Sequence, residues 1–177
     1  MLPEEVIRSF SPMVYRIAFA RAGSKADADD IFQEVFLRYI KKQPEFRDGE
    51  HAKAWFIKVA VNCSRKFLGG MVKKNEVSGD WLAEVGATAE EAGGKGSSPE
   101  ECIFAEERKA ELYRGLQKLS PDARLLLHLF YFEELKTKEI AKLMHRKEVT
   151  VRVQLTRARE KLKAQFEEDG VLELLRV

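Results

Sequence analysis

The chain has 177 residues, of which 45% are hydrophobic and 34% charged, and its formal net charge is +2. This length and apolar content allow one ordinary domain or two small ones with buried cores, so we expect a globular protein. No apolar run approaches the roughly 18 residues of a membrane span, and the N-terminus lacks the apolar core of a signal peptide. We therefore expect a cytoplasmic protein with no membrane insertion. Cys63 and Cys102 have no paired spacing and are expected to be reduced structural thiols.

The charges are distributed unevenly along the chain, which matters more for partners than the net charge. Residues 76–107 contain nine acidic residues and one lysine, a net charge of −8. Residues 135–166 contain ten basic and three acidic residues, a net charge of +7. An acidic middle therefore separates the first part of the chain from a basic C-terminal part.

Residues 2 to about 68 have the pattern of helices, and strand signals are nearly absent. In the segment 24–42, Ser24 is a plausible N-cap, acids follow it and two lysines end it, as the helix dipole favours. Its buried face is predicted to hold Ile31, Phe32, Val35, Phe36, Tyr39 and Ile40. A polar patch remains at the front of this helix, with more acids than capping requires, made of Asp29, Asp30, Gln33 and Glu34.

The segment 51–68 is predicted to be a helix that combines a buried face with a basic and aromatic one. Phe56, Val59, Ala60, Cys63 and Phe67 line the buried face, and Trp55, Lys58, Asn62, Arg65 and Lys66 lie off it. Cations that follow a phosphate backbone, together with rings that stack on bases, suit single-stranded nucleic acid.

The stretch from residue 70 to residue 98 is rich in Gly, Ala, Ser and Glu, the composition of a flexible linker. Helices resume with two N-terminal signals, a Ser–Pro pair at Ser98 and another at Ser120, and the first has Glu101 at the capping-box position. Next come a short helix, "KTKEIAKLMH", a tight connection and a cationic helix. This is the order of a helix-turn-helix, in which the second helix enters the major groove.

The cationic helix, "TVRVQLTRAREKLKAQF", has one apolar stripe at helical spacing, made of Val151, Leu155, Ala158, Leu162 and Phe166. Its outward side carries residues that contact phosphates and donate hydrogen bonds to base edges. The alternative is a solvated face, but such faces usually mix charges of both signs for i,i+4 pairing. Here cations outnumber acids, which favours contact with nucleic acid.

With "DADDIFQEVFLRY…AWFIKVAVNCSRKFL" and "LSPDARLLLHLFYFEELKTKEIAKLM…TVRVQLTRAREKLK" in this order, the chain resembles the extracytoplasmic-function (ECF) class of bacterial RNA polymerase sigma factors. The resemblance implies an all-α fold of two small helical domains, a sigma region 2-like bundle at 1–69 and a region 4-like helix-turn-helix at 99–177, joined by the flexible acidic linker 70–98. It also implies that the chain binds core RNA polymerase, through the clamp helices of β′ and the flap of β, and promoter DNA. An anti-sigma factor is the expected regulator.

The resemblance also assigns site residues by position. In the first domain, Asp30, Gln33 and Glu34 would dock on the clamp helices, and the downstream promoter element would be opened and bound by Phe46, Arg47, His51, Trp55, Asn62, Arg65 and Lys66. Capture of an extruded base costs a few kcal/mol, offset by stacking and edge hydrogen bonds. Trp55 has the alternative role of a simple core residue. In the last helix, the upstream element would be read by Arg152, Val153, Gln154, Thr156 and Arg157, with Lys147 and Arg159 on phosphates.

The sequence departs from the family at the helix-turn-helix junction. Where the family commonly has a glycine, a small hydroxyl cap and another glycine, this chain has His145, Lys147 and Val149, and Lys136 occupies the capping position of the preceding helix. A missing N-cap costs about 1 kcal/mol. His tolerates a positive φ, so a turn at His145 stays open.

Two other functions were weighed. A stand-alone helix-turn-helix DNA-binding regulator would explain the cationic helix but leaves the acidic patch at Asp30 and Glu34 unexplained. An enzyme has little support, because His51, His128 and His145 have no metal-ligand spacing with the cysteines and "GGKGSS" lacks the spacing of a phosphate-binding loop. We therefore expect no catalytic residues, no metal and no cofactor.

Overall fold

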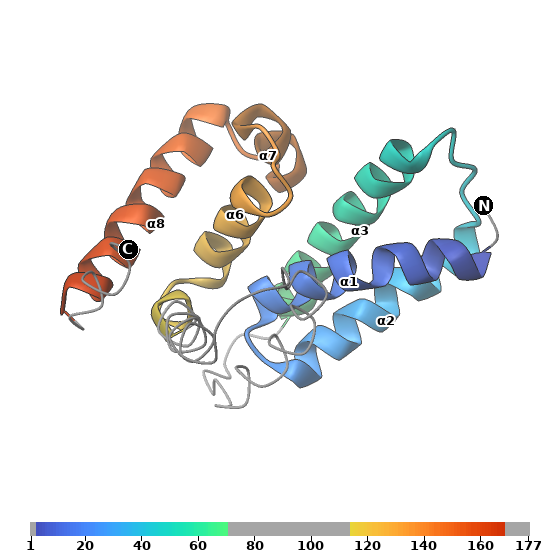
Figure 1. Cartoon of the computed structure of the whole chain (residues 1–177), viewed down its shortest axis with the longest axis horizontal. Coiled ribbons are helices and arrows are strands. Elements are labelled where there is room, and N and C mark those ends of the chain that lie inside the picture. Colours follow the sequence, from blue (N-terminus) through green and yellow to red (C-terminus); the bar gives the residue numbers. More distant parts are fainter. Residues whose placement is uncertain (1–2, 71–113, 169–177) are drawn as a thin grey trace, which may run out of the picture.

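A computed structural model describes residues 3–70 and 114–168, and these residues form helices and connecting turns without a strand (Figure 1). The helices are α1 (Pro3–Ala22), α2 (Lys25–Lys42), α3 (Gly49–Gly70), α6 (Pro121–Tyr131), α7 (Thr137–Met144) and α8 (Glu148–Glu168). The all-α expectation is therefore confirmed. The predicted linker beyond residue 70, the capping start at Ser98 and Cys102 lie outside the described residues.

The first three helices form a bundle whose boundaries are set by local hydrogen bonds. Ser24 has an extended backbone and its side chain accepts a hydrogen bond from Asp27 N at 3.3 Å, which confirms the predicted cap of α2. At the start of α3, Asp48 Oδ1 accepts from His51 N at 2.7 Å. This second cap explains why α3 begins two residues before the predicted start at residue 51.

The core of the N-terminal bundle consists of the predicted apolar faces with one correction. Ile31 and Val35 are fully buried, and Phe36 and Tyr39 are at most 8% exposed. Ile40, which the pattern placed in the buried face, is 54% exposed. Within the described residues no element covers this side of the last turn of α2, so Ile40 remains on the surface.

The C-terminal bundle has the predicted helix-turn-helix order, with α6 packed on α8 and α7 packed on α8. Ser120 caps α6 by accepting from Ala123 N at 3.3 Å, and Pro121 is the first helical residue, as predicted. The apolar stripe of α8 is also confirmed. Val151, Leu155, Ala158 and Phe166 are at most 7% exposed, and Leu162 is half-buried.

The two bundles pack against each other, a contact that the sequence did not predict. The end of α1 lies beside α6, and α7 lies beside α3 (Figure 1). A single cluster of buried side chains extends from Val6 in α1 to Ala158 in α8. The two domains therefore share one apolar core in this arrangement.

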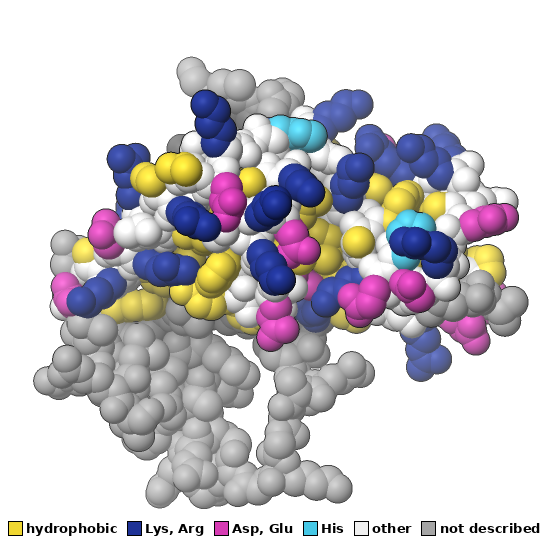
Figure 2. Space-filling model, turned by 90° about the horizontal axis from the view of Figure 1, so that it is seen from above, with side chains coloured by type: hydrophobic (Ala, Val, Ile, Leu, Met, Phe, Trp, Pro, Cys, Tyr) yellow, Lys and Arg dark blue, Asp and Glu magenta, His cyan; other side chains and the backbone are white. Residues whose placement is uncertain are grey.

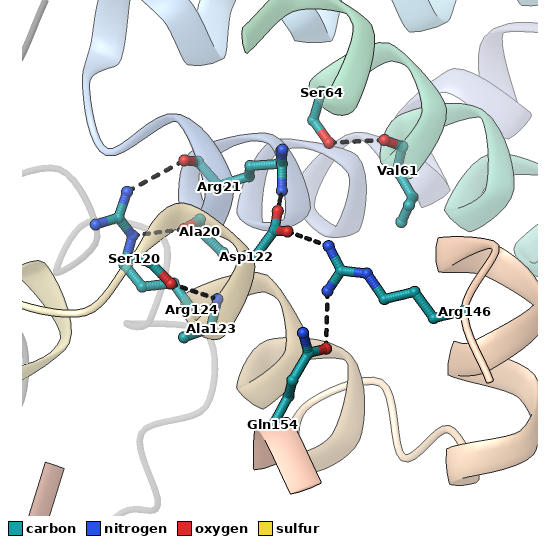
Figure 3. A network of polar contacts seen from close by, with 10 residues as sticks. All are labelled: Ala20, Arg21, Val61, Ser64, Ser120, Asp122, Ala123, Arg124, Arg146 and Gln154. Carbon is teal, nitrogen blue, oxygen red and sulfur yellow. Dashed lines mark hydrogen bonds and ion pairs between the residues drawn. The ribbon is translucent and has the colours of Figure 1, made fainter. Parts of the chain in front are cut away.

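Arg124 of α6 is the main polar contact between the bundles (Figure 3). It is 9% exposed, and its Nε and Nη2 donate to Ala20 O at 2.9 Å and to Arg21 O at 3.1 Å, the carbonyls at the end of α1. Its Nη1 donates to Leu119 O at 3.0 Å. Gly23, with φ of +70°, passes so close that an added Cβ would lie 2.8 Å from Nη2. A buried guanidinium thus satisfies the C-terminal carbonyls of α1.

Candidate nucleic-acid interface

The turn between α7 and α8 is built without glycine. His145 adopts the left-handed conformation, with φ of 52° and ψ of 47°. Arg146 N donates to Ala141 O at 2.9 Å and His145 N donates to Lys142 O at 3.3 Å. These two bonds form a Schellman motif, the usual end of a helix before a left-handed residue. The structure therefore confirms that His145 makes the turn that the missing glycine left open.

The first turn of α8 has no N-cap side chain, since Lys147 carries no acceptor. Instead, Glu148 Oε1 accepts hydrogen bonds from Thr137 Oγ1 and from Arg152 Nη2, both at 2.8 Å. These bonds, the one from Thr137 first, lower the pKa of Glu148 below its ordinary value. The carboxylate lies at the positive end of the helix dipole and joins the first turns of α7 and α8.

The start of α7 is stabilised in a similar way. Lys136 stands at the N-cap position, where its side chain cannot accept a hydrogen bond, but its backbone N–H donates to Glu139 Oε2 at 2.8 Å. This is one half of a capping box. Glu139 thus accepts from a backbone N–H at the start of α7, whereas the hydrogen bonds of Glu148 come from side chains and do not replace a hydroxyl cap of α8.

The exposed face of α8 carries most of the residues predicted to contact the upstream element. At about 100° per residue, Val153, Thr156 and Arg157 lie opposite the buried stripe, and all three are exposed. Arg152 and Arg159 lie on one flank of this face and Gln154 lies on the other. The structure therefore gathers six of the predicted residues around the N-terminal half of α8, namely Lys147, Arg152, Val153, Gln154, Thr156 and Arg157.

The flanking side chains already have partners within the protein. Arg152 pairs with Glu148, and Gln154 Oε1 accepts from Arg146 Nη1 at 2.8 Å. The Arg159 guanidinium lies over the rings of Phe130 and Tyr131, 5.2 and 5.4 Å from their centroids. Cation–π contacts of this kind orient the arginine toward the end of α6. Arg159 is therefore set apart from the other predicted DNA contacts.

The predicted downstream-element residues form two groups, one at the start of α3 and in the turn before it, and one further along α3. The first group surrounds Phe46, whose ring centroid is 5.8 Å from that of His51 and 5.9 Å from that of Trp55. Arg47 N donates to His51 Nδ1 at 3.3 Å. The second group consists of Asn62, Arg65 and Lys66. Asn62 lies seven residues after Trp55 on the same face of α3, about 10 Å further along the helix axis.

Trp55 is half-buried and packs edge-on against Phe56, with ring centroids 5.0 Å apart, and against Tyr39. The core role weighed for this residue is thus present in the structure. Its base-contacting role stays a prediction. Phe46, His51 and Trp55 form a partly exposed aromatic cluster, and the exposed Arg47 is a neighbouring cation.

The acidic patch of α2 is exposed and has an apolar neighbour that the sequence analysis did not single out. Asp30, Gln33 and Glu34 are exposed, and Glu34 pairs with Arg38 at 2.7 Å. Leu37 and Ile40, one turn further on, are 49% and 54% exposed. The helical spacing of Gln33, Leu37 and Ile40, at i, i+4 and i+7, places these residues on one face of α2 with the acidic patch. This surface was missed because Ile40 was predicted to lie in the core. Mixed acidic and large apolar side chains are typical of a protein-binding surface.

Lys and Arg side chains occur over both halves of the face shown in Figure 2. Among the described residues, no group of three or more His, Cys, Asp or Glu side chains is placed to hold a metal ion. Cys63 is free and 3% exposed, and burial raises the pKa of its thiol. In the same part of the chain, no helix has the length and apolar character required to cross a membrane.

Comparison with known proteins identifies both halves of the chain. The family model for Sigma-70 region 2 matches residues 6–69, and that for Sigma-70, region 4 matches residues 109–162. The ECF RNA polymerase sigma factor SigE of Mycolicibacterium smegmatis is 26% identical over 160 residues, which are 90% of this chain and 60% of that protein. The ECF RNA polymerase sigma-E factor of Escherichia coli K12 is 28% identical over 137 residues, 76% of this chain and 71% of that one.

A solved structure has the same fold over nearly the whole chain. The sigma factor RpoE of Bartonella quintana, in complex with the anti-sigma factor NepR, superposes with a TM-score of 0.60 at 16% identity, covering 93% of this chain and 96% of that one. The two family matches occur in the order of regions 2 and 4 and together cover more than half of the sequence. This chain therefore belongs to the sigma-70 family, as a member of the ECF class of RNA polymerase sigma factors.

Proposed function

We propose that this chain associates with core RNA polymerase and directs it to promoters, with the α1–α3 bundle opening the downstream element and α8 binding the upstream element. The observation that carries this proposal is the presence of regions 2 and 4 on one chain, each with an exposed face suited to its role. A stand-alone helix-turn-helix regulator is not favoured, because it has no need for region 2.

The docking surface for the clamp helices of β′ is proposed to be the outer face of α2. Asp30, Gln33 and Glu34 supply charge and hydrogen-bond acceptors. Leu37 and Ile40 supply apolar surface that is exposed to solvent in the free chain. Burial of two large aliphatic side chains at the centre of a contact, with acids at its edge, gives both affinity and orientation.

Upstream recognition is proposed to place the N-terminal half of α8 in the major groove. Val153, Thr156 and Arg157 would face base edges, and Lys147 and Arg152 would contact phosphates at either side. Val153 is 42% exposed, and an apolar side chain at this position suits contact with a thymine methyl group. An arginine at the centre of the face, Arg157, suits a bidentate contact with guanine, which is worth about 1–3 kcal/mol of discrimination.

Downstream recognition is proposed to use both groups, the aromatic one around the start of α3 and the cationic one further along it. The rings of Phe46, His51 and Trp55 would stack on or wall an unstacked base, and Asn62 would donate to or accept from a base edge. Arg65 and Lys66 would follow the phosphates. The division of the site into an aromatic end and a cationic end supports this assignment.

Two further partners are proposed. Tyr131 and Phe132, at the end of α6, are 55% and 67% exposed, and these aromatic side chains provide an apolar surface suited to the flap of β. The Bartonella quintana sigma factor forms a complex with an anti-sigma factor. Because the fold of this chain is similar over both regions, we propose that an anti-sigma factor also regulates it.

The test of the polymerase-binding role is association of the purified full chain with bacterial core RNA polymerase, followed by transcription from a library of random promoters. The double charge reversal Asp30→Lys with Glu34→Lys should abolish association. The matched control is Glu4→Lys with Glu45→Lys, which reverses two exposed acids elsewhere in the same bundle. Equal association of both variants, or tight binding of duplex DNA by the chain without polymerase, would refute the proposal.

A further inference from the structure

The exposed side of α8 that lies opposite its buried stripe begins with two branched apolar side chains. Val149, in the first turn, is 71% exposed, and Val153, one turn later, is 42% exposed. At about 100° per residue, Thr156 continues the same line along the helix axis. A single exposed apolar side chain is ordinary on a protein surface, but three methyl-bearing side chains in one line form a continuous strip. We name Val149, Val153 and Thr156 the methyl strip.

Thr156 belongs to the methyl strip because its hydroxyl proton is already used. Its Oγ1 donates to Arg152 O at 3.0 Å, the carbonyl one turn back in the same helix. Since a threonine hydroxyl has one proton, this side chain cannot also donate to a base while that bond is made. The other group that the side chain carries is a methyl.

The longer polar side chains beside the strip also have partners within the protein. Arg152 Nη2 donates to Glu148 Oε1 at 2.8 Å. Gln154 Oε1 accepts from Arg146 Nη1 at 2.8 Å. Hydrogen bonding of either side chain to a base therefore requires an exchange of partners. The methyl groups of the strip can be buried against an apolar surface without the loss of any hydrogen bond, so apolar contact is the interaction for which this part of α8 is preorganised.

The charges around the methyl strip indicate what covers it. Lys147, Arg152 and Arg157 are exposed and lie beside the strip in the same half of α8, and Glu160 follows on the same line and ends it. Cations around an apolar strip fit duplex DNA, in which phosphates border the major groove and thymine presents a 5-methyl group within it. A protein with acids around an apolar centre is the alternative occupant, and its binding would make no distinction between thymine and uracil in DNA.

The length of the methyl strip sets the number of base pairs that it can contact. From Val149 to Thr156 the helix rises about 10 Å, which is the rise of about three base pairs at 3.4 Å each. A·T and T·A pairs both place a thymine methyl in the major groove. We propose that the methyl strip binds thymine methyl groups there, so that the upstream element of this chain contains about three adjacent A·T pairs recognised by apolar contact rather than by hydrogen bonds. This inference deepens the proposed role of α8 in upstream recognition and rests on it.

Replacing thymine by uracil tests this contact, because uracil lacks the 5-methyl group and retains every hydrogen-bonding group of the base. The probe is a fluorescein-labelled duplex that carries the motif enriched from a random-sequence duplex library by the full chain assembled with core RNA polymerase. The motif is synthesised with thymine or with uracil at the same positions, and the two dissociation constants are measured by fluorescence anisotropy. Burial of one methyl group is worth about 0.8 kcal/mol, so the parent chain should bind the thymine form about two- to fourfold more tightly for each thymine that it contacts.

The double substitution Val149→Ser with Val153→Ser should remove most of this preference for thymine. Both positions are exposed, and serine and valine have similar helix propensities, so the variant should fold. Lys163→Ser is the matched control, since it places a serine at an exposed position in the C-terminal half of the same helix. Whatever this control does to the affinity for both duplexes, their ratio should equal that of the parent. If the double variant does not fold, Val149→Ser alone replaces it, with an intermediate ratio expected.

Equal binding of the two duplexes by the parent would overturn the inference, and so would an enriched motif without A·T pairs. A preference for thymine that persists in the double variant would assign it to the shape of the DNA instead of methyl contact, which also overturns the inference. Failure of the chain to assemble with core polymerase would refute the proposed function alone, because the chain by itself would then be used to select duplexes at low ionic strength. No enrichment of any sequence by either form would overturn the inference as well.

Discussion

Replacing His145 by glycine should stabilise the free protein. The left-handed conformation at this residue, with φ of 52°, costs an L-residue about 1–2 kcal/mol, and His lies at the lower end of that range. Glycine removes this cost but gives the unfolded chain more freedom, which offsets about 0.4–1 kcal/mol. The net gain should be at most about 0.6 kcal/mol, and the melting temperature of a chain of this size should rise by at most about 2 °C.

Urea unfolding followed by far-ultraviolet circular dichroism measures this difference. Lys142→Gly is the matched control, because Lys142 is exposed in α7 and has a helical backbone, where glycine costs about 1 kcal/mol. The two glycines should therefore change the free energy of unfolding in opposite directions. If both lower it by similar amounts, the backbone at position 145 is not strained and the explanation of the turn is wrong.

Three further predictions concern the helix-turn-helix and the thiol. Lys147→Ser should supply the missing cap of α8, raise the stability of the free chain by about 1 kcal/mol and weaken promoter binding; stronger binding at unchanged stability would contradict it. Glu148 has a lowered pKa in the folded chain, so its contribution is present above the ordinary glutamate pKa and is lost as the pH falls through the lowered one. Between about pH 5 and pH 3, the free energy of unfolding should therefore fall more steeply with decreasing pH in the parent than in Glu148→Gln. Equal slopes would refute the assignment. Buried Cys63 should resist iodoacetamide until urea unfolds the chain, and rapid labelling of this residue under native conditions would show that the described packing is wrong.

The helices could be predicted from the sequence because their determinants are local. Ser24 and Ser120 cap the helices that follow them, and the apolar stripe of α8 starts at Val151 and is buried as its spacing requires. A cap depends on three or four consecutive residues, and a stripe depends on the period of one helix. Both kinds of signal can be read without knowledge of the tertiary fold.

The parts that sequence analysis missed depend on residues that are distant in the chain. The sequence analysis did not single out Arg124, which is buried because its guanidinium donates to the carbonyls at the end of α1. Ile40 was predicted to lie in the core, but no element among the described residues covers it. The predicted site residues also gave no indication that Gln154 would be bound by Arg146, eight residues away across the turn. Such contacts become visible only when the bundles are placed together.

The ion pairs near α8 differ in exposure, and this difference affects how readily each arginine can exchange its protein partner for a phosphate. The Arg152 side chain of the Arg152–Glu148 pair is 67% exposed, so its exchange of partners for a phosphate is nearly free. Arg146, which pairs with Asp122 and donates to Gln154, is 22% exposed, and a shielded hydrogen bond between charged groups is worth about 1.5–3 kcal/mol. Arg152 could therefore turn to a phosphate at little cost, whereas the proposed base contact of Gln154 requires its hydrogen bond from Arg146 to break first. Non-specific phosphate contact should consequently precede any base contact by Gln154.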